Sequence, residues 1–225
     1  MSWQDARTAG AVALLVLATA TWVPAKDGDK KKGPLPGNDA LILDLAGNGV
    51  DLTGTATTKL VGGKSKKLCW TKADTDDAFL VLDADGLLKA KFNVTGAGGA
   101  KLAGKVLLNG DVTVKAKRDE GGSNVQASGS VWLALRDLDT NRDGKVDASD
   151  PTWEFFKVWV DKNADGATGA DELRGMTDAS VKEIALPTTA PEDSAKADDA
   201  GNVRVDGEFT LADGKTACAA AVTFA

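Results

Sequence analysis

Short apolar runs, separated by glycine-rich and acid-rich turns, follow one another along most of the chain. The runs ALILDL and AFLVLD, beginning at Ala40 and Ala78, have the length and composition of buried strands. Near the C-terminus, an alternating segment from Val203, a turn at 212–214 and a second alternating segment predict a closing hairpin. The pattern therefore predicts strands at both ends of the folded region.

Two segments between these strands have apolar residues three or four positions apart, as helices do. SVWLALRDL predicts a short helix capped by Ser128 or Ser130. PTWEFFKVWV predicts a second helix over 151–160, with Pro151 at its first position. We therefore expect an α+β fold with short strands and hairpins at both ends and short helices between them.

The remaining segments divide the chain into regions. Residues 1–25 contain an apolar stretch that is short for a membrane helix and predict a signal peptide, or an uncleaved membrane anchor. Residues 26–38 are charged and rich in glycine and proline, which predicts a flexible linker. Residues 39–225 form the expected module. Its glycine-rich part near 95–130 is read as an inserted hairpin that turns at Asn109-Gly110.

Charge and composition narrow the chemistry. The chain has no histidine, which excludes histidine-based triads and histidine-ligated zinc. The net charge of -6 equals that of residues 137–178 alone, where eleven acids face five bases. This concentration favours a cation site and argues against nucleic acid as a partner. Cys69 and Cys218 match no metal-binding spacing, and they would be a candidate disulfide in an exported protein.

The acidic segment contains a first loop of EF-hand type, over residues 139–150. Such loops place oxygen ligands at positions 1, 3, 5, 7, 9 and 12, with glycine at position 6. Gly144 occupies position 6 and Val146 supplies the apolar residue at position 8. The predicted calcium ligands are Asp139, Asn141, Asp143, the carbonyl of Lys145, Asp147 and Asp150.

A second loop of the same type occupies residues 161–172. Gly166 stands at position 6, while Gly169 at position 9 leaves that ligand to water. The predicted ligands are Asp161, Asn163, Asp165, the carbonyl of Ala167 and Glu172. Only the ten residues 151–160 separate the loops, so we expect one short helix shared by both rather than a sensor-type EF-hand pair.

Two fainter acidic loops have weaker patterns. DLAGNG begins at Asp44 but has Ala46 at a ligand position, and DADGLL begins at Asp83 with no suitable ligand after it. Both are more typical of turn carboxylates than of metal sites. A dockerin-like interaction module would need two similar loop-helix repeats, and the single shared helix argues against it. Trp153, Phe155 and Trp159 are expected in the core rather than on a partner surface.

The order of motifs resembles the haemolysin-type calcium-binding family, and most closely the calcium-dependent self-processing module of iron-regulated RTX proteins. The resemblance rests on LILDLAGNGVDLTG, CWTKADTDDAFLVLDADG, LRDLDTNRDGKVDASD, FKVWVDKNADG and GEFTLADGKTA, in that order. It covers residues 39–225, and its most specific piece is W-x-D-x-N-x-D-G at 159–166. It implies a bacterial protein that is secreted or displayed on the cell surface, or that resides in the periplasm, and that folds around calcium.

Self-processing members of that family cleave an Asp-Pro bond at the start of the module. The aspartate carboxylate attacks its own carbonyl, and a lysine amine can capture the resulting anhydride. The aligned bond here is Asp39-Ala40, which retains the aspartate and lacks the proline. Asp150-Pro151 is read instead as a calcium ligand followed by a helix-starting proline.

These observations predict an exported calcium-binding domain with a structural or adhesive role, stabilised by Ca²⁺ at two loops. The alternative is a calcium-triggered self-processing module that cleaves after Asp39. Calcium ions are the expected partners, a cell-surface or protein partner stays unidentified, and membrane contact is expected only through residues 1–25.

Overall fold

A computed structural model describes most of the chain from residue 39 onward. The described residues are 39–52, 56–60, 64–68, 70–90, 92–95, 101–102, 105–107, 113–116, 130–166, 168–169, 171–188, 196–197 and 203–223. The predicted signal peptide or anchor at 1–25 and the linker at 26–38 lie outside them. Among the described residues, no helix has the length and apolar character that crossing a membrane requires.

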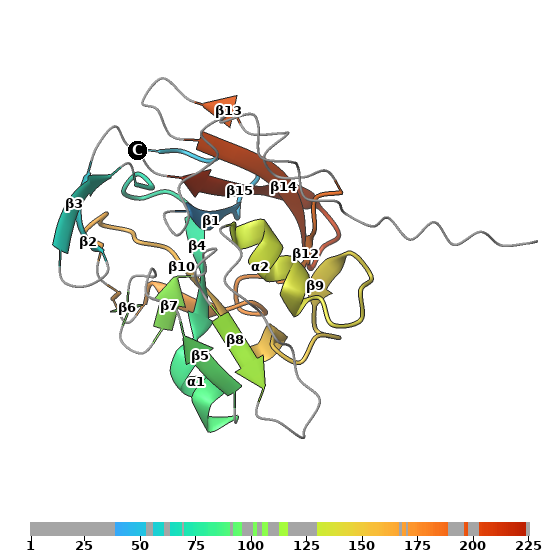
Figure 1. The fold of residues 1–225 in the computed structure, drawn as a ribbon. Helices are drawn as coiled ribbons and strands as arrows, with labels where there is room; N and C mark the ends of the chain where they lie inside the picture. Colours follow the sequence, from blue (N-terminus) through green and yellow to red (C-terminus); the bar gives the residue numbers. More distant parts are fainter. Residues whose placement is uncertain are drawn as a thin grey trace, which may run out of the picture. The chain divides into compact units, whose positions relative to one another are not determined.

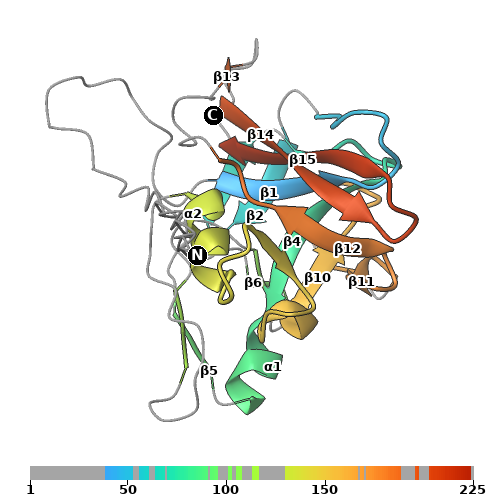
Figure 2. The ribbon, with the colours of Figure 1, turned by 90° about the vertical axis from the view of Figure 1, so that its right-hand side faces the viewer.

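One curved antiparallel sheet organises the module (Figures 1 and 2). Its eight-strand path runs β11-β10-β4-β1-β15-β14-β12-β9. The strands are β1 (Asp39–Asp44), β4 (Asp77–Asp83), β9 (Lys145–Asp147), β10 (Phe156–Trp159), β11 (Leu173–Gly175), β12 (Val181–Ala185), β14 (Val203–Leu211) and β15 (Thr216–Thr223). The two apolar runs and the closing hairpin predicted from the sequence are therefore β1, β4 and β14-β15.

Shorter elements surround this path. The short strands β6 (Lys101–Leu102), β7 (Lys105–Leu107) and β13 (Lys196–Ala197) join the same sheet, while β2 (Ala56–Leu60) pairs β3 (Lys64–Leu68) and β5 (Phe92–Thr95) pairs β8 (Thr113–Ala116). The helices described are α1 (Ala84–Lys89), α2 (Val131–Leu138) and a 3₁₀ turn, η1 (Trp153–Phe155).

The expected α+β class is wrong, because the described fold is mostly β with two short α-helices. The error lies in 151–160, where the predicted shared helix is a single 3₁₀ turn followed by β10. Phe156, Val158 and Val160 enter one core cluster while Trp159 enters the other, which is the two-residue alternation of a strand. Pro151 therefore precedes a 3₁₀ turn instead of starting a helix.

The predicted inserted hairpin falls partly outside the described residues, since Asn109 and Gly110 are not among them. The strands on either side of this turn pair elsewhere. β7 pairs β4 and β6, and β8 pairs β5. The described pairings therefore contain no ladder between β7 and β8.

The core lies on both faces of the central strands, so β1 is buried along its whole length. One face packs Leu41 and Leu43 with residues of α2, and the other packs Ile42 with Trp70 and Trp159. A strand covered on both faces needs a continuous apolar run, which ALILD supplies. Of the aromatic residues expected in the core, Trp159 is fully buried, whereas Trp153 and Phe155 are only partly buried where they pack against it.

Helix α2 is the predicted SVWLALRDL helix, and it packs closely on the sheet. Its Trp132 side chain lies so near Gly207 of β14 that an added Cβ would stand 2.6 Å from the ring. The Trp132 Nε1–H also donates to the carbonyl of Val205 at 3.3 Å. Ser130 occupies the N-cap position, as predicted, but makes no side-chain cap hydrogen bond.

Candidate metal centres

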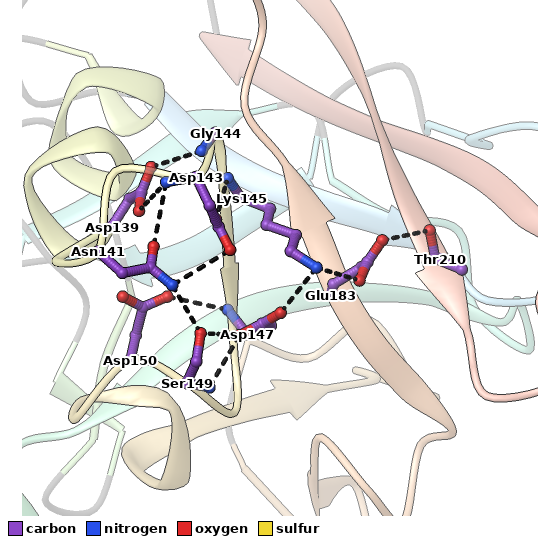
Figure 3. Close-up of polar contacts among 10 residues, drawn as sticks. All are labelled: Asp139, Asn141, Asp143, Gly144, Lys145, Asp147, Ser149, Asp150, Glu183 and Thr210. Carbon is purple, nitrogen blue, oxygen red and sulfur yellow. Dashed lines mark hydrogen bonds and ion pairs between the residues drawn. The ribbon is translucent and has the colours of Figure 1, made fainter.

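The first loop folds around the carboxylate of its first residue. The Asp139 oxygens accept the N–H groups of Asp143 at 3.2 Å and Gly144 at 2.9 Å. Asn141 closes the next turn by accepting the Asp143 N–H and donating its own amide to the Asp143 carboxylate. Figure 3 shows these side chains pointing toward one another inside the loop. The structure thus gathers the ligands predicted at positions 1, 3 and 5.

The twelfth residue closes the first loop from the opposite side. Asp150 is buried, and its carboxylate accepts the Thr140 N–H at 2.7 Å. It also accepts the Asp147 N–H at 3.1 Å (Figure 3). A burial this deep is unusual for a carboxylate outside a polar or ionic site. Asp150 therefore spans the loop as a ligand at position 12 would, although it is one carbon shorter than glutamate.

Lysine and serine contacts surround the ninth position of the first loop. Lys145 Nζ lies 3.0 Å from both the Asp147 carboxylate and Glu183 of β12 (Figure 3). Hydrogen bonds from Ser149 hold the pKa of Asp147 down at about 2. Asp147 is therefore ionised throughout the physiological range. Glu183 connects this loop to the sheet by accepting a hydrogen bond from Thr210 of β14.

The second loop repeats the geometry of the first. The Asp161 oxygens accept Asp165 N–H at 3.1 Å and Gly166 N–H at 2.8 Å, and Asn163 bridges Asp165 as Asn141 bridges Asp143. Asp161 is almost completely buried, and desolvation raises its pKa. Ala167, whose carbonyl was predicted at position 7, lies outside the described residues.

Glutamate supplies the twelfth residue of the second loop. Glu172 is buried and accepts the N–H groups of Gly169 at 2.7 Å and Lys162 at 3.2 Å. The Trp159 indole N–H adds a longer contact at 3.4 Å. Glu172 therefore folds back over the start of its loop from the far end, as Asp150 does in the first.

Both loops also share a left-handed backbone at their fourth and sixth positions. Arg142 and Ala164 have φ values of 59° and 53°, and Gly144 and Gly166 have φ values of 87° and 73°. Glycine is the residue that adopts this region without a steric cost, which explains the glycine at position 6. The residues present offer only oxygen donors, the set preferred by calcium, so the loops fit a calcium ion.

A third centre forms where the sequence predicted only a turn. Asp44 accepts N–H groups of Gly47 at 2.8 Å, Asn48 at 3.1 Å and Gly49 at 2.6 Å, and both glycines have positive φ. The hydrogen bond from the sixth residue to the first is therefore the same as in the two predicted loops. DLAGNG thus has the backbone of a metal loop despite alanine at position 3.

Two carboxylates from elsewhere in the chain complete this third centre. Asp76 accepts the Ala46 N–H at 2.7 Å and the Asn48 side-chain amide at 3.2 Å. Oxygens of Asp44, Asp76 and Asp77 lie within 4.8 Å of one another, a spacing that no other such acidic group among the described residues shows. Asp76 therefore brings a carboxylate to the position where Ala46 has none. We call this group the Asp44 centre.

Asp76 and Asp77 were not predicted as partners of Asp44, because they lie about thirty residues from it in the sequence. The signal that would have found them is strand pairing. β1 and β4 are antiparallel, and their register places Asp77 directly opposite Asp44. Pairing the ALILD and AFLVLD runs from the sequence would have brought the acids before β4 to the end of β1.

Asp77 is the carboxylate of the Asp44 centre whose ionised form is most disfavoured by its surroundings. Its side chain is buried, one oxygen accepts the Asp51 N–H at 2.8 Å, and no hydrogen bond to the other oxygen is found within the described part of the chain. Desolvation, with the nearby charges of Asp76 and Asp44, raises its pKa to about 6. Like charges opposed across two strands destabilise a sheet, and a bound cation would remove that penalty.

We expect Asp77→Asn to stabilise the calcium-free protein at neutral pH. The Asp77 pKa rises from 3.8 unfolded to about 6 folded, so its stabilising contribution is lost as pH rises across that window. Thermal unfolding in EGTA should show the variant about 1–3 kcal/mol more stable than the parent at pH 7.5 and equal to it near pH 4. Added calcium should reverse the order at pH 7.5.

Asp76→Asn is the matched control for this prediction. Asp76 already accepts two hydrogen bonds, so its substitution should weaken calcium binding without stabilising the calcium-free protein. A calcium-free Asp77→Asn protein no more stable than the parent at pH 7.5 would contradict the burial argument.

The other faint loop, DADGLL, is a helix start. α1 begins at Ala84, and the Asp83 carboxylate accepts the Gly86 N–H at 3.0 Å. This is the bond of an N-cap aspartate, and it agrees with the interpretation of Asp83 as a turn carboxylate.

Asp39 lies at the start of β1, in contact with the start of α2. Its buried carboxylate accepts the Val131 N–H at 2.5 Å. Val131 is the first residue of α2, whose N-terminus favours a negative charge. Asp139, the first ligand of the first loop, directly follows Leu138, the last residue of this helix. One eight-residue helix therefore connects the first loop to Asp39.

Cys218, the cysteine that the structure describes, is not among the residues of these centres. Cys218 lies on β15, where its sulfur is 3.0 Å from Arg204 Nη2. Burial raises the pKa of its thiol. Cys69 lies outside the described residues, so a disulfide between Cys69 and Cys218 stays a prediction.

Comparison with known proteins identifies the family. The SPM domain model matches residues 41–225. The iron-regulated protein FrpA of Neisseria meningitidis serogroup C is 30% identical over 200 residues, which cover 84% of this chain and 15% of that protein. This chain thus spans a small part of the length of the relative, so the activity of the whole relative is not transferred to it. The resemblance inferred from the motifs is confirmed: the chain belongs to the SPM domain family, the self-processing modules of RTX-type proteins.

Proposed function

We propose that this chain is a calcium-dependent self-processing module that breaks the bond between Asp39 and Ala40. The observation that carries the proposal is the contact between the Asp39 carboxylate and the N-terminus of α2. The motif resemblance matches Asp39 to the family's reacting aspartate. Asp39 contacts one end of α2, and a candidate calcium loop follows the other end. Family membership supports the same function.

The proposed reaction uses the ionised carboxylate of Asp39. One side-chain oxygen attacks the carbonyl carbon of Asp39, and the bond to the Ala40 nitrogen breaks. That nitrogen takes up a proton from water, which becomes hydroxide, and leaves as a new amine. The product is a cyclic anhydride at Asp39. Water opens it to two carboxylates, or a lysine amine opens it to an amide and one carboxylate.

Protein groups prepare this carboxylate in two ways. The Val131 N–H holds one oxygen at a fixed place, and the partial positive charge of the helix start favours its ionised form. Burial of Asp39 and Ala40 keeps water away from the bond. Calcium, held by the loop carboxylates, would supply positive charge to the acidic segment and order the residues that follow α2.

Incubating the whole purified chain with calcium tests this function. We expect a fragment that begins at Ala40, detected by intact-mass analysis, in calcium and not in EGTA. Asp39→Asn should abolish it, because an amide is a far weaker nucleophile than a carboxylate. An intact chain after prolonged incubation in calcium would contradict the proposal.

Val131→Pro examines the role of the helix contact within the same experiment. Proline has no N–H and is accepted at the first position of a helix, and Ser130 before it is already extended at φ -145° and ψ 137°. The helix should persist while its bond to Asp39 is lost, so cleavage should slow. Val131→Ala, which keeps the N–H, is the control for lost side-chain packing.

The alanine at position 40, where self-processing members have proline, favours a second function. Without proline the scissile bond has a poorer leaving group, and a module that binds calcium without cleaving would have a structural or adhesive role. Export to the cell surface or the medium is part of both proposals. The same incubation with calcium distinguishes the two functions. A structural or adhesive module should be stabilised by calcium and should yield no fragment.

A further inference from the structure

The segment from Trp70 to Asp77, which we call the bridging segment, contacts the second loop near its beginning. The Trp70 indole N–H donates to the Asp161 carboxylate at 2.6 Å, across 91 residues of sequence. The backbone N–H of Asp74 donates to the carbonyl of Lys162 at 2.9 Å. Two hydrogen bonds therefore attach the bridging segment to the first two residues of that loop.

The same segment ends in the Asp44 centre. Asp76 and Asp77 are its last two residues, and their oxygens lie within 4.8 Å of that of Asp44. Asp76 also binds the backbone of the Asp44 loop at Ala46. The bridging segment thus contacts the second loop near one end and supplies two carboxylates at the other.

Packing and local hydrogen bonds fix the shape of the bridging segment. Trp70 is fully buried against Phe79 and Trp159, with ring centroids 4.5 and 5.8 Å away. Asp74 adopts a left-handed φ of 59°, and Thr75 Oγ1 donates to the Lys72 carbonyl at 3.0 Å. A segment held in one conformation transmits a displacement at one end to the other.

Trp70 also determines how the Asp161 carboxylate is presented. One Asp161 oxygen accepts both the indole N–H and the Gly166 N–H, so the carboxylate is fixed in rotation. The other oxygen accepts only the longer Asp165 N–H bond among the contacts described for it. Removing the indole donor would leave a buried carboxylate with one fewer hydrogen bond.

We propose that Trp70 is a positioning residue for the second loop, and that the bridging segment couples cation binding at this loop to cation binding at the Asp44 centre. Filling one site fixes the position of the segment, which places its other end for the second cation and so raises the affinity of that site. Coupling of this kind is reciprocal. The inference rests on the calcium binding included in the proposed function and concerns the order in which the sites fill. The first loop contacts β12 through Lys145 and Glu183, and it provides the internal reference.

Calcium titration followed by amide NMR tests this coupling site by site. Gly49, Gly144 and Gly166 each donate to the first carboxylate of their own loop, so their amide signals report the Asp44 centre, the first loop and the second loop. Asp165→Ala, which removes a second-loop ligand, should raise the calcium midpoint of Gly49 about fivefold or more. Asp143→Ala, the equivalent change in the first loop, should leave that midpoint unchanged.

Trp70→Phe separates positioning from packing. It keeps an aromatic ring and removes the N–H, so the midpoints of Gly49 and Gly166 should both rise while that of Gly144 stays. Phe79→Leu disturbs the same aromatic cluster without removing a donor to Asp161. It should lower the melting temperature of the calcium-free protein and leave the ratio of the midpoints unchanged.

Two results would overturn the coupling. One is a Gly49 midpoint that responds equally to Asp165→Ala and Asp143→Ala, and the other is a Gly49 amide in the parent protein that does not respond to calcium. Fragment formation at Asp39 in the same samples is a separate measurement. If the sites bind calcium independently and the fragment still forms, only the coupling proposal is contradicted. If the sites are coupled and no fragment forms, only the self-processing proposal is contradicted.

Discussion

Chelating calcium with EGTA is expected to lower the melting temperature of this chain by at least about 10 °C, because the ion stabilises only the native state. A site filled at 100 times its dissociation constant adds about 2.7 kcal/mol, and a chain of this size shifts by about 2–4 °C per kcal/mol. Buried carboxylates at Asp77, Asp150, Asp161 and Glu172 make the calcium-free state costly. Differential scanning calorimetry with and without the ion measures the difference.

Single substitutions divide this effect among the centres. Asp44→Ala, Asp139→Ala and Asp161→Ala should each reduce the difference between the calcium-loaded and calcium-free melting temperatures. These residues also make loop hydrogen bonds in the absence of calcium, and losing those bonds lowers both melting temperatures. The difference between the two temperatures cancels that effect, which either temperature alone would include. Asp213→Ala, at an exposed turn where the carboxylate pairs with Lys215, is the control and should leave the difference intact. If EGTA leaves the melting temperature of the parent protein unchanged, calcium binding at all three centres is contradicted.

Stoichiometry is part of the same expectation. The sequence predicted two ions, whereas the Asp44 centre predicts a third. Isothermal titration calorimetry on the parent protein should therefore give more than two bound calcium ions per chain. The Asp76→Asn variant should bind one ion fewer. A parent protein that binds two ions, with Asp76→Asn unchanged, would mean that the Asp44 centre holds no calcium.

Local patterns predicted the parts of this protein in which a short segment determines its own structure. The loops at 139–150 and 161–172 fold around their first carboxylates because acid, asparagine and glycine spacing sets the backbone there. Helix α2 and the closing hairpin were likewise readable from one stretch of residues each.

Predictions failed where pairing between distant segments decides the outcome. Apolar residues at 153, 156 and 160 satisfy a helical period, yet the edge of β4 offers hydrogen-bond partners that make residues 156–159 a strand. The Asp44 centre was missed for the same reason, since its three carboxylates meet only when β1 and β4 pair. Sheet register, unlike loop spacing, is not contained in a window of a dozen residues.

The contact between Asp39 and α2 is another long-range feature. Ser128 or Ser130 was expected to cap this helix. Ser130 occupies the N-cap position without a side-chain cap bond, and the Val131 N–H donates to a carboxylate 92 residues away. A serine at the N-cap position therefore gave no indication that an aspartate from β1 would bind there. Together with family membership, this contact favours the proposed self-processing module over a calcium-binding scaffold.

Replacing Ala40 by proline is expected to accelerate calcium-dependent cleavage after Asp39 by about tenfold or more, which corresponds to a barrier lower by about 1.4 kcal/mol. A proline nitrogen belongs to a tertiary amide. It leaves as a secondary amine, which is a better leaving group than the primary amine of alanine. Position 40 is the second residue of β1, near a strand end where proline is tolerated better than at the centre. Intact-mass analysis of fragment yield over time gives the rate.

The double variant Asp39→Asn/Ala40→Pro is the control, and it should stay intact because the nucleophile is absent. The native Asp150-Pro151 bond provides a second control within the same chain. It has the proline, but its carboxylate is the predicted twelfth ligand of the first loop, and a carboxylate bound to calcium is a poor nucleophile. A fragment beginning at Pro151 would show that proline alone selects the bond. A fragment beginning at residue 40, with Asp150-Pro151 intact, would show that the held carboxylate of Asp39 selects it.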